Sequence, residues 1–168
     1  MTCYVQASAK ISNQFLGEKE GLFCTIDPSL FEQAILNMAI NALHAMKSVG
    51  QLYIAVRNAN LEDAVSMAKL DLPPGDYVLI SIEDTGMGMP PAVLERIFEP
   101  FFTTKTAEDG TGLGLSMTFG FVKQSGGYIA AESVEGKGSI FRMFLPRAMA
   151  EGSIEAAIIE PSVPQPLP

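Results

Sequence analysis

The sequence predicts an α+β two-layer sandwich, in which a mixed β-sheet carries helices on one face. Three observations lead to this class. Apolar residues recur with a helical period after residue 30, two later runs alternate apolar and polar residues, and a glycine-containing turn joins two further apolar runs. Helices and strands are interleaved, yet hairpin connections are also present, so the sheet is expected to be mixed rather than wholly parallel.

The first part of the chain is expected to give two short strands and a long helix. The strands are expected near Cys3–Ser8 and at Leu22–Ile26. Asp27-Pro28-Ser29 then supplies a helix start, because proline fits the first turn and a short polar side chain can cap it. The buried face of this helix is expected to consist of Phe31, Ala34, Ile35, Met38, Ala42 and Ala45.

Two strands and a short helix are expected next. Alternation centred on Ile54 predicts one strand, and alternation centred on Ile80 predicts the other, after the turn at Pro73-Pro74-Gly75. Pro90–Ile97 then has the pattern of a short helix with proline first.

The last predicted elements are a helix and a hairpin. Leu113–Gln124 is expected to be helical and to end at Gly126-Gly127. Tyr128–Ser133 and Ile140–Leu145 are expected to pair across the turn Glu135–Gly138.

Composition changes after Arg147, where four prolines occupy the last eight residues and exclude a helix or a central strand there. We therefore expect one domain at residues 1–147 and a proline-rich tail or linker at residues 148–168. Within this tail, Ile154–Ile159 has the length of a short helix or strand that would start another module.

Composition also excludes several classes of function. An apolar content of 48% excludes a disordered chain, and a net charge of −8 disfavours a nucleic-acid binder. The uncharged run Gln33–Met46 has 14 residues, fewer than the ~18 needed to cross a bilayer, so no membrane contact is expected. Cys3 and Cys24 form no disulfide framework, and no secretory signal is evident, so a cytoplasmic location is expected.

Three polar residues stand out in the first helix. Asn37, Asn41 and His44 fall within an arc of roughly 60° beside its apolar face. Asparagine is disfavoured inside helices because its amide competes for backbone hydrogen bonds. The two amides can face a cation or phosphate, and they can equally satisfy buried backbone or water, while His44 alone is ordinary for a surface position.

Two glycine-rich segments and one loop are the other candidates. Asp84–Pro90 places an aspartate before glycines that admit a flat ring, although it also fits a capped turn. Gly110–Ser116 opens a helix with backbone N–H groups suited to phosphate, but it matches neither the Walker nor the dinucleotide pattern, and a packing turn is the alternative. Phe98–Lys105 combines three phenylalanines, which can simply enter the core, with a polar tip able to reach phosphate.

Taken in chain order, the four segments resemble the N, G1, F and G2 boxes of the catalytic, ATP-binding domain of sensor histidine kinases. That domain belongs to the superfamily shared with DNA gyrase, the heat-shock-ninety chaperones and the mismatch-repair ATPases. The resemblance runs from about Asp27 to Pro146 and is greatest to kinases of the nitrogen-regulator and hybrid-sensor type. It implies a Bergerat-type ATP-binding fold with a flexible lid.

The resemblance also implies roles for individual residues. Asn41 would bind Mg²⁺, Asp84 would accept from the adenine amine, and Ser139 would stand near a water where the family usually has threonine. His44 replaces a frequent lysine or arginine, which makes it a weaker phosphate partner. The implied catalytic residues are Asn37, Asn41, His44 and Lys105. The implied ATP-binding residues are Asn37, Asn41, Asp84, Gly86, Gly88, Phe102, Thr103, Thr104, Lys105, Gly110, Thr111, Gly112, Leu113, Gly114, Leu115 and Ser139, with residues 89–112 as the lid.

One position bears on the type of reaction. In the hydrolysing branches of the superfamily a glutamate lies four residues before the magnesium-binding asparagine, where this chain has Asn37, which cannot act as a general base. The resemblance thus implies transfer of the γ-phosphoryl group of ATP to a histidine, with Mg²⁺ as cofactor.

That histidine is expected on a separate dimerisation domain, because no acceptor segment is evident in this chain. The chain is therefore expected to be a catalytic fragment that is not competent alone. A response-regulator receiver domain is the second expected partner.

Two alternatives share the fold. A degenerate regulatory or interaction module would bind ATP without transferring phosphate, which the His44 replacement suits and the intact asparagine, aspartate and glycine positions disfavour. A serine kinase similar to anti-sigma factors would need a protein substrate, and the sequence of Phe98–Lys105 disfavours it.

Overall fold

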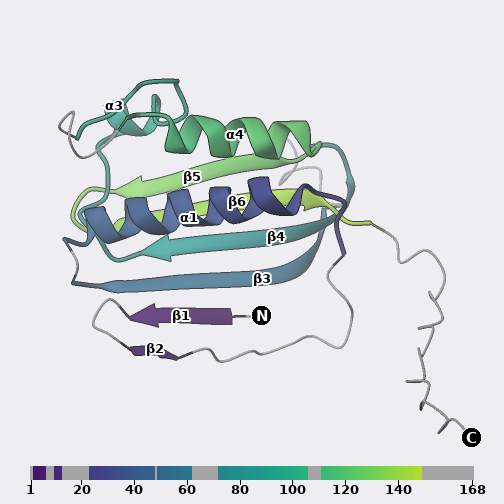
Figure 1. Cartoon of the computed structure of the whole chain (residues 1–168), viewed down its shortest axis with the longest axis horizontal. Helices are drawn as coiled ribbons and strands as arrows, with labels where there is room; N and C mark the ends of the chain where they lie inside the picture. Colours follow the sequence, from purple (N-terminus) through teal and green to yellow (C-terminus); the bar gives the residue numbers. More distant parts are fainter. Residues whose placement is uncertain are drawn as a thin grey trace, which may run out of the picture.

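A computed structural model describes residues 23–47, 49–61, 72–105 and 111–148, together with the backbone of residues 2–6 and 10–12. One sheet and two longer helices make up the described fold (Figure 1). In chain order the elements are β1 (Thr2–Gln6), β2 (Lys10–Ser12), α1 (Pro28–Ala45), β3 (Gln51–Leu61), β4 (Gly75–Asp84), α3 (Pro91–Leu94), α4 (Gly114–Gln124), β5 (Tyr128–Val134) and β6 (Gly138–Pro146).

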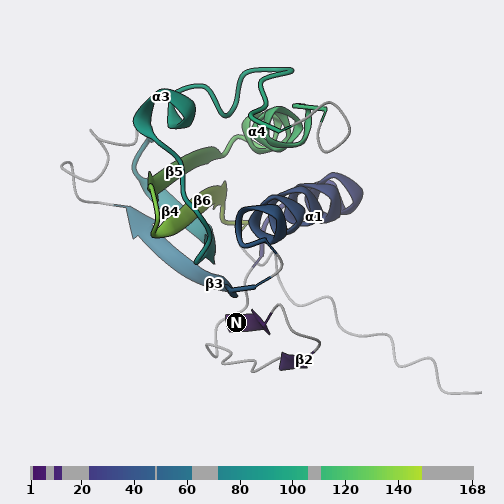
Figure 2. The ribbon, with the colours of Figure 1, turned by 90° about the vertical axis from the view of Figure 1, so that its left-hand side faces the viewer.

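The sheet has the strand order β2-β1-β3-β4-β6-β5. α1 and α4 lie on one of its faces, which confirms the α+β two-layer sandwich (Figure 2). The described neighbours all pair antiparallel, so no parallel pair of a mixed sheet is found among them. β4 and β5 do run parallel, joined by a crossover through α4, but β6 returns between them.

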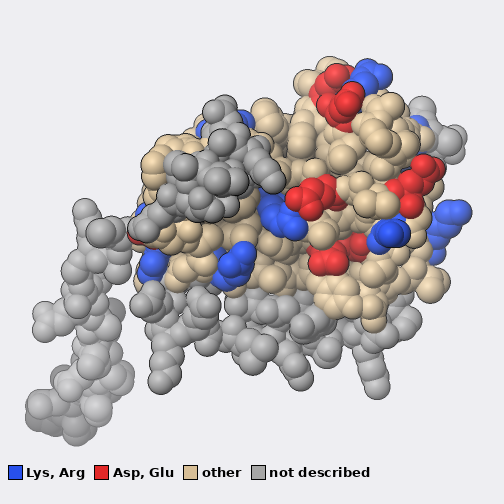
Figure 3. All heavy atoms as spheres, turned by 180° about the vertical axis from the view of Figure 1, so that it is seen from behind, with Lys and Arg blue, Asp and Glu red and all other residues tan. Residues whose placement is uncertain are grey.

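The other face of the sheet carries no helix among the described residues, and side chains of both charges gather on it (Figure 3). Arg142 and Glu132 pair there at 2.7 Å. Tyr77, Leu79 and Phe144 form a small apolar cluster on the same face. The deeper core, and with it the candidate site residues, belongs to the helical face.

The start of α1 follows the sequence prediction closely. Asp27 caps it by accepting hydrogen bonds from the Ser29 and Leu30 N–H groups at 2.9 and 3.0 Å, and Pro28 occupies the first turn. Ala34, Met38 and Ala42 are its buried residues. Since these residues face the sheet, the neighbouring helix face with Asn37, Asn41 and His44 is left beside the core.

The strand expected at Leu22–Ile26 is wrong for residues 23–26, and Leu22 lies outside the described residues. This segment is extended but belongs to no strand. Cys24 and Ile26 use their apolar side chains to pack against the core, and the Phe23 carbonyl accepts a hydrogen bond from the Ala148 N–H at 2.8 Å. The apolar pattern here reflects packing rather than strand pairing.

The remaining elements confirm the predicted order with small shifts. The expected helix at Pro90–Ile97 is a four-residue helix, α3, followed by turns, and the expected hairpin is β5–β6. β2 was not expected. Gly110 and the segment Ile154–Ile159 lie outside the described residues, so the boundary between domain and tail stays a prediction. No helix in the described parts of the chain is long and apolar enough to span a membrane.

Candidate functional site

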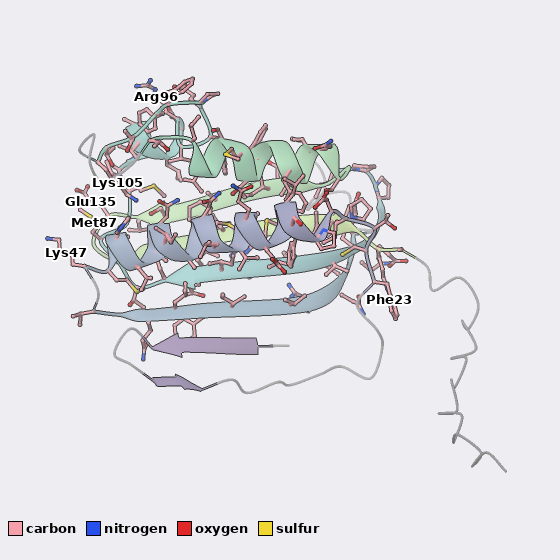
Figure 4. All side chains as sticks on the ribbon, in the orientation of Figure 1. Phe23, Lys47, Met87, Arg96, Lys105 and Glu135 are labelled. Atoms are coloured by element: carbon pink, nitrogen blue, oxygen red, sulfur yellow. The ribbon has the colours of Figure 1, made fainter. Side chains whose placement is uncertain are left out.

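A cavity of about 930 Å³ lies between α1, the loop after β4, the lid segment and the start of α4. Figure 4 places Lys105 and Met87 at this end of the sandwich and Phe23 at the other. Fifteen of the predicted site residues line it, namely Asn37, Asn41, His44, Asp84, Gly88, Phe102, Thr103, Thr104, Lys105, Thr111, Gly112, Leu113, Gly114, Leu115 and Ser139. Gly86 is not among the residues that line the cavity, and Gly110 lies outside the described residues.

The first polar group of the cavity centres on the ammonium of Lys105. Its Nζ donates to Asn41 Oδ1 at 2.8 Å and lies 2.8 Å from His44 Nδ1. A residue of the lid segment therefore contacts α1 across a separation of 64 residues. This geometry shows that the Asn41 oxygen points into the cavity and accepts a cationic group.

Asn37 has a different contact. Its Nδ2 donates to the Gly114 carbonyl at 3.3 Å, an oxygen that also accepts from the Thr118 hydroxyl at 3.0 Å. Asn37 thus ties α1 to the first residue of α4. The helix pair holds the described part of the glycine-rich segment against the cavity.

The second polar group of the cavity centres on Asp84, whose side chain is only 5% exposed. The Gly86 N–H donates to Asp84 Oδ1 at 2.8 Å. Burial raises the pKa of Asp84, while hydrogen bonds from Gly86 and from the backbone and hydroxyl of Ser139 act in the opposite direction. The result is a desolvated carboxylate with donors on one side and the cavity on the other.

Two glycines in this region fit where a side chain would not. A Cβ on Gly88, whose φ is +64°, would overlap the Val134 carbonyl oxygen. A Cβ on Gly112, whose φ is +70°, would lie 2.5 Å from the Phe101 carbonyl carbon. Both positions let the loops close tightly around the cavity.

Gly112→Ala is expected to destabilise the fold by roughly 1–3 kcal/mol, because alanine at this φ is strained and its methyl displaces the Phe101 backbone. Thermal or denaturant unfolding measures this loss. Gly120→Ala is the matched control on α4, since a Cβ there meets nothing within 4 Å. We expect that control to be neutral or stabilising by up to ~1 kcal/mol, and equal losses in both variants would contradict the strain at Gly112.

The lid segment is anchored by aromatic side chains, as its sequence suggested. Phe98 stacks on Phe119 with ring centroids 5.4 Å apart, and Phe102 lines the cavity. The Arg96 guanidinium lies 4.4 Å from the Phe102 ring centroid, a cation–π contact that no sequence motif predicted. Phe101 instead is 74% exposed.

Five apolar residues of the cavity wall were not predicted from the sequence. Ile40, Leu43, Met87, Met117 and Phe141 line the wall and suit a flat, partly apolar ligand. Helical and strand periodicity identifies residues that face the core. Several of the apolar wall residues lie at the margin of the core instead, so periodicity does not identify them. Their place in the cavity wall follows only from the packing of α1 against the lid segment.

The described residues contain no group of three or more His, Cys, Asp or Glu side chains that could hold a metal ion. A cation at Asn41 would therefore need further oxygen ligands from a bound molecule. Mg²⁺ commonly binds in this way, through one or two protein oxygens together with substrate phosphates and water. The Asn41 oxygen, which already accepts a cationic nitrogen, fits such a partial site.

Fold and cavity together define an α+β sandwich domain with a ligand-binding cavity between its helices and the lid segment. The chain belongs to the family of histidine kinase-, DNA gyrase B- and HSP90-like ATPases, whose family model matches residues 26–149. Within this family, its relatives identify the chain as a catalytic ATP-binding domain of histidine kinases, as the sequence resemblance indicated.

Among curated proteins, the chain is 51% identical over 125 residues to the sensor kinase CckA of Brucella abortus and 38% identical over 120 residues to the sensor histidine kinase ZraS of Salmonella typhimurium. These matches cover 74% and 71% of this chain but only 13% and 22% of the relatives. The chain thus spans a small part of the length of these sensor kinases.

Solved structures agree with the sequence relatives. The mycobacterial sensor histidine kinase MprB has a TM-score of 0.55 and 27% identity, covering 75% of this chain and 76% of that one. Full-length ShkA in complex with AMPPNP has a TM-score of 0.53 and 29% identity, covering 77% of this chain and 24% of that one.

Proposed function

We propose that this domain binds Mg²⁺ and ATP and donates the γ-phosphoryl group to a histidine on a separate dimerisation domain of a two-component sensor kinase. A response-regulator receiver domain would then accept the phosphoryl group, all in the cytoplasm. One observation carries the proposal. Among the described residues that line the cavity, Asp84 is the sole carboxylate, and its buried position at the cavity wall, with donors from Gly86 and Ser139 beside it, supports its use as the acceptor for a bound base.

The residue at position 37 favours phosphoryl transfer over hydrolysis. Hydrolysis needs a group that takes a proton from water, and the position for it in the hydrolysing relatives holds Asn37. The Asn37 amide donates to the Gly114 carbonyl and has no basic group to offer. A positioned ATP is then better used by an external nucleophile, such as an imidazole nitrogen.

The two polar groups suit the two ends of ATP. Asp84 would accept from the adenine amine, and the apolar wall residues would cover the ring. Asn41 would hold Mg²⁺, which when bound neutralises phosphate charge. The AMPPNP complex of the related ShkA supports an adenine nucleotide as the ligand.

Lys105 would change partners when nucleotide binds. Its ammonium now contacts Asn41 Oδ1, so occupation of Asn41 by a metal requires Lys105 to leave. The released ammonium then lies next to the polar lid residues Thr103 and Thr104 and can bind the phosphates. Lys105 and His44 would thus become phosphate partners only in the complex.

The test adds radiolabelled ATP and Mg²⁺ to this chain with a separately purified dimerisation domain of the same kinase. We expect acid-labile, base-stable label on that domain, dependent on both proteins and lost when its acceptor histidine is replaced by alanine. Neither protein alone should become labelled.

Other outcomes would contradict this proposal in distinct ways. Acid-stable label on serine would indicate a serine kinase instead. Micromolar binding of ATP without transfer to the acceptor domain would favour a regulatory nucleotide-binding module. Calorimetry with ADP, and with GTP as control, establishes first that the adenine site exists.

A further inference from the structure

A row of three polar residues crosses the helical face of the sheet behind the cavity. Strand pairing places Asp84 on β4 opposite Ser139 on β6, and Ser139 opposite Ser133 on β5. Asp84 and Ser139 line the cavity, whereas Ser133 does not. Ser133 is partly buried and is the residue of this row that no sequence motif indicated.

Ser133 joins three segments through its hydroxyl oxygen. The Met89 N–H donates to Ser133 Oγ at 2.8 Å, and Ser133 Oγ lies 3.0 Å from the Gly138 carbonyl oxygen. Its distance to Ser139 Oγ is also 3.0 Å. The loop after β4 is thereby tied to the β5–β6 hairpin at the level of Asp84.

The hydrogens available in this row restrict how it can be arranged. Each serine hydroxyl donates a single hydrogen. If Ser139 gives its hydrogen to the Asp84 carboxylate, its contact with Ser133 exists only when Ser133 is the donor. If Ser133 instead donates to Gly138, either Ser139 donates to Ser133 and Asp84 loses that donor, or Ser139 keeps donating to Asp84 and the two serine oxygens lie 3.0 Å apart with no hydrogen between them.

The first arrangement is the favourable one for an ionised Asp84. A buried carboxylate binds donors more strongly than a neutral carbonyl does, and a chain of hydroxyl donors polarises each bond in it. The order Ser133 to Ser139 to Asp84 therefore directs two hydroxyl groups toward the charge. The face of Asp84 that meets the cavity is left for a donor from the ligand.

We propose that Ser133 is a positioning residue of the base-binding pocket, which orients the Ser139 hydroxyl toward Asp84. This inference rests on the proposed function, because it assigns Asp84 to the amine of a bound adenine. Ser133 contacts no ligand itself. It acts on base recognition through Ser139, and the phosphate contacts at Asn41 and Lys105 do not depend on it.

The experiment is a double-mutant cycle on ADP affinity with Ser133→Ala, Ser139→Ala and the double variant, measured by calorimetry. Loss of one neutral hydrogen bond predicts that Ser133→Ala weakens ADP binding about fivefold in the wild-type background. In the Ser139→Ala background the same change should cost less than about twofold, because the hydroxyl it orients is gone. Affinity for inorganic tripolyphosphate, which lacks a base, should stay within about twofold throughout.

Ser81→Ala is the matched control, since Ser81 is a serine on β4 whose side chain alternates to the sheet face opposite Asp84. It should leave ADP affinity unchanged. Ser133→Cys, which keeps the size of the side chain but donates weakly, takes the place of Ser133→Ala in the same cycle if the alanine variant does not fold.

Three results would overturn the inference. These are full additivity of the two serine substitutions, an equal loss of tripolyphosphate affinity, and an ADP affinity unaffected by Ser133→Ala. A wild-type chain that does not bind ADP would instead contradict the proposed function, and this inference with it. ADP binding that ignores Ser133 would contradict this inference alone.

Discussion

Replacing Asp84 with asparagine is expected to lower the affinity for ADP about a hundredfold, the loss typical of a charge-assisted hydrogen bond at a buried site. The amide presents a donor where the adenine amine also donates. Asp84 is 5% exposed, so water cannot readily replace the lost contact. Calorimetric titration with ADP measures the effect.

The same substitution should leave the fold as stable as wild type, or make it more stable. Burial raises the pKa of the Asp84 carboxyl above its ordinary value, so ionising this group costs free energy in the folded state. That cost is fully present above the folded pKa and absent below the unfolded pKa. The stability of Asp84→Asn relative to wild type should therefore rise as the pH increases through this window, as denaturant unfolding at several pH values would show.

Asp76→Asn is the control for this experiment, because Asp76 lies on the same strand but is exposed and pairs with Asn60 at 2.9 Å. It should leave ADP affinity unchanged. Unchanged ADP affinity in folded Asp84→Asn would contradict the assignment of the base pocket. A large loss of stability in Asp84→Asn at neutral pH would show that the carboxylate is structural.

Asp84→Asn is thus expected to weaken ADP binding without weakening the fold. A desolvated carboxylate at this position serves ligand binding and not stability. Ile80 and Ile82 on the same strand are buried and contribute to the core, and an apolar residue at position 84 would extend their pattern. Asp84 interrupts it at the end of β4, where the cavity begins. Asp84 therefore lowers the stability of the fold at a position where a bound ligand can donate the missing hydrogen bond.

Sequence patterns predicted the parts of this fold that depend on neighbouring residues. The start of α1 was predictable because Asp27 and Pro28 act within one helical turn. The prediction of a strand at Leu22–Ile26 failed because Cys24 and Ile26 are partly buried by packing against the core without a strand partner. Alternating apolar residues report burial, and burial alone does not distinguish the two cases.

The candidate site depended on contacts that no local pattern contains. Asn37 reaches the Gly114 carbonyl across 77 residues, and Lys105 reaches Asn41 across 64. The link between Ser133 and the candidate site follows only from the strand register, which places Ser133 opposite Ser139. The resemblance to histidine kinases named most of the lining residues, while their hydrogen-bond partners had to come from the structure.

Asn41→Ala is expected to lower the affinity for Mg²⁺–ATP on the order of a hundredfold, as loss of a metal ligand does. Magnesium-free ADP should bind within about threefold of wild type, because Asp84 and the apolar wall are unchanged. Phosphoryl transfer to the acceptor domain should fall by about 10²–10³ in rate at saturating nucleotide. Titrations with and without Mg²⁺, followed by the transfer assay, measure these quantities.

The contact between Asn41 and Lys105 gives this prediction a second part. Asn41→Ala removes the oxygen that receives the Lys105 ammonium at 2.8 Å and leaves the contact of that ammonium with His44 Nδ1 in place. In this variant the Asn41 oxygen no longer competes with phosphate for the Lys105 ammonium. Magnesium-free ATP should therefore bind as well as it does to the wild type, or somewhat better. Gln33→Ala, an exposed amide on α1 outside the cavity lining, is the matched control and should change none of these values. Equal losses for Mg²⁺–ATP and for magnesium-free ADP would show that Asn41 supports the fold of the pocket and does not bind the metal.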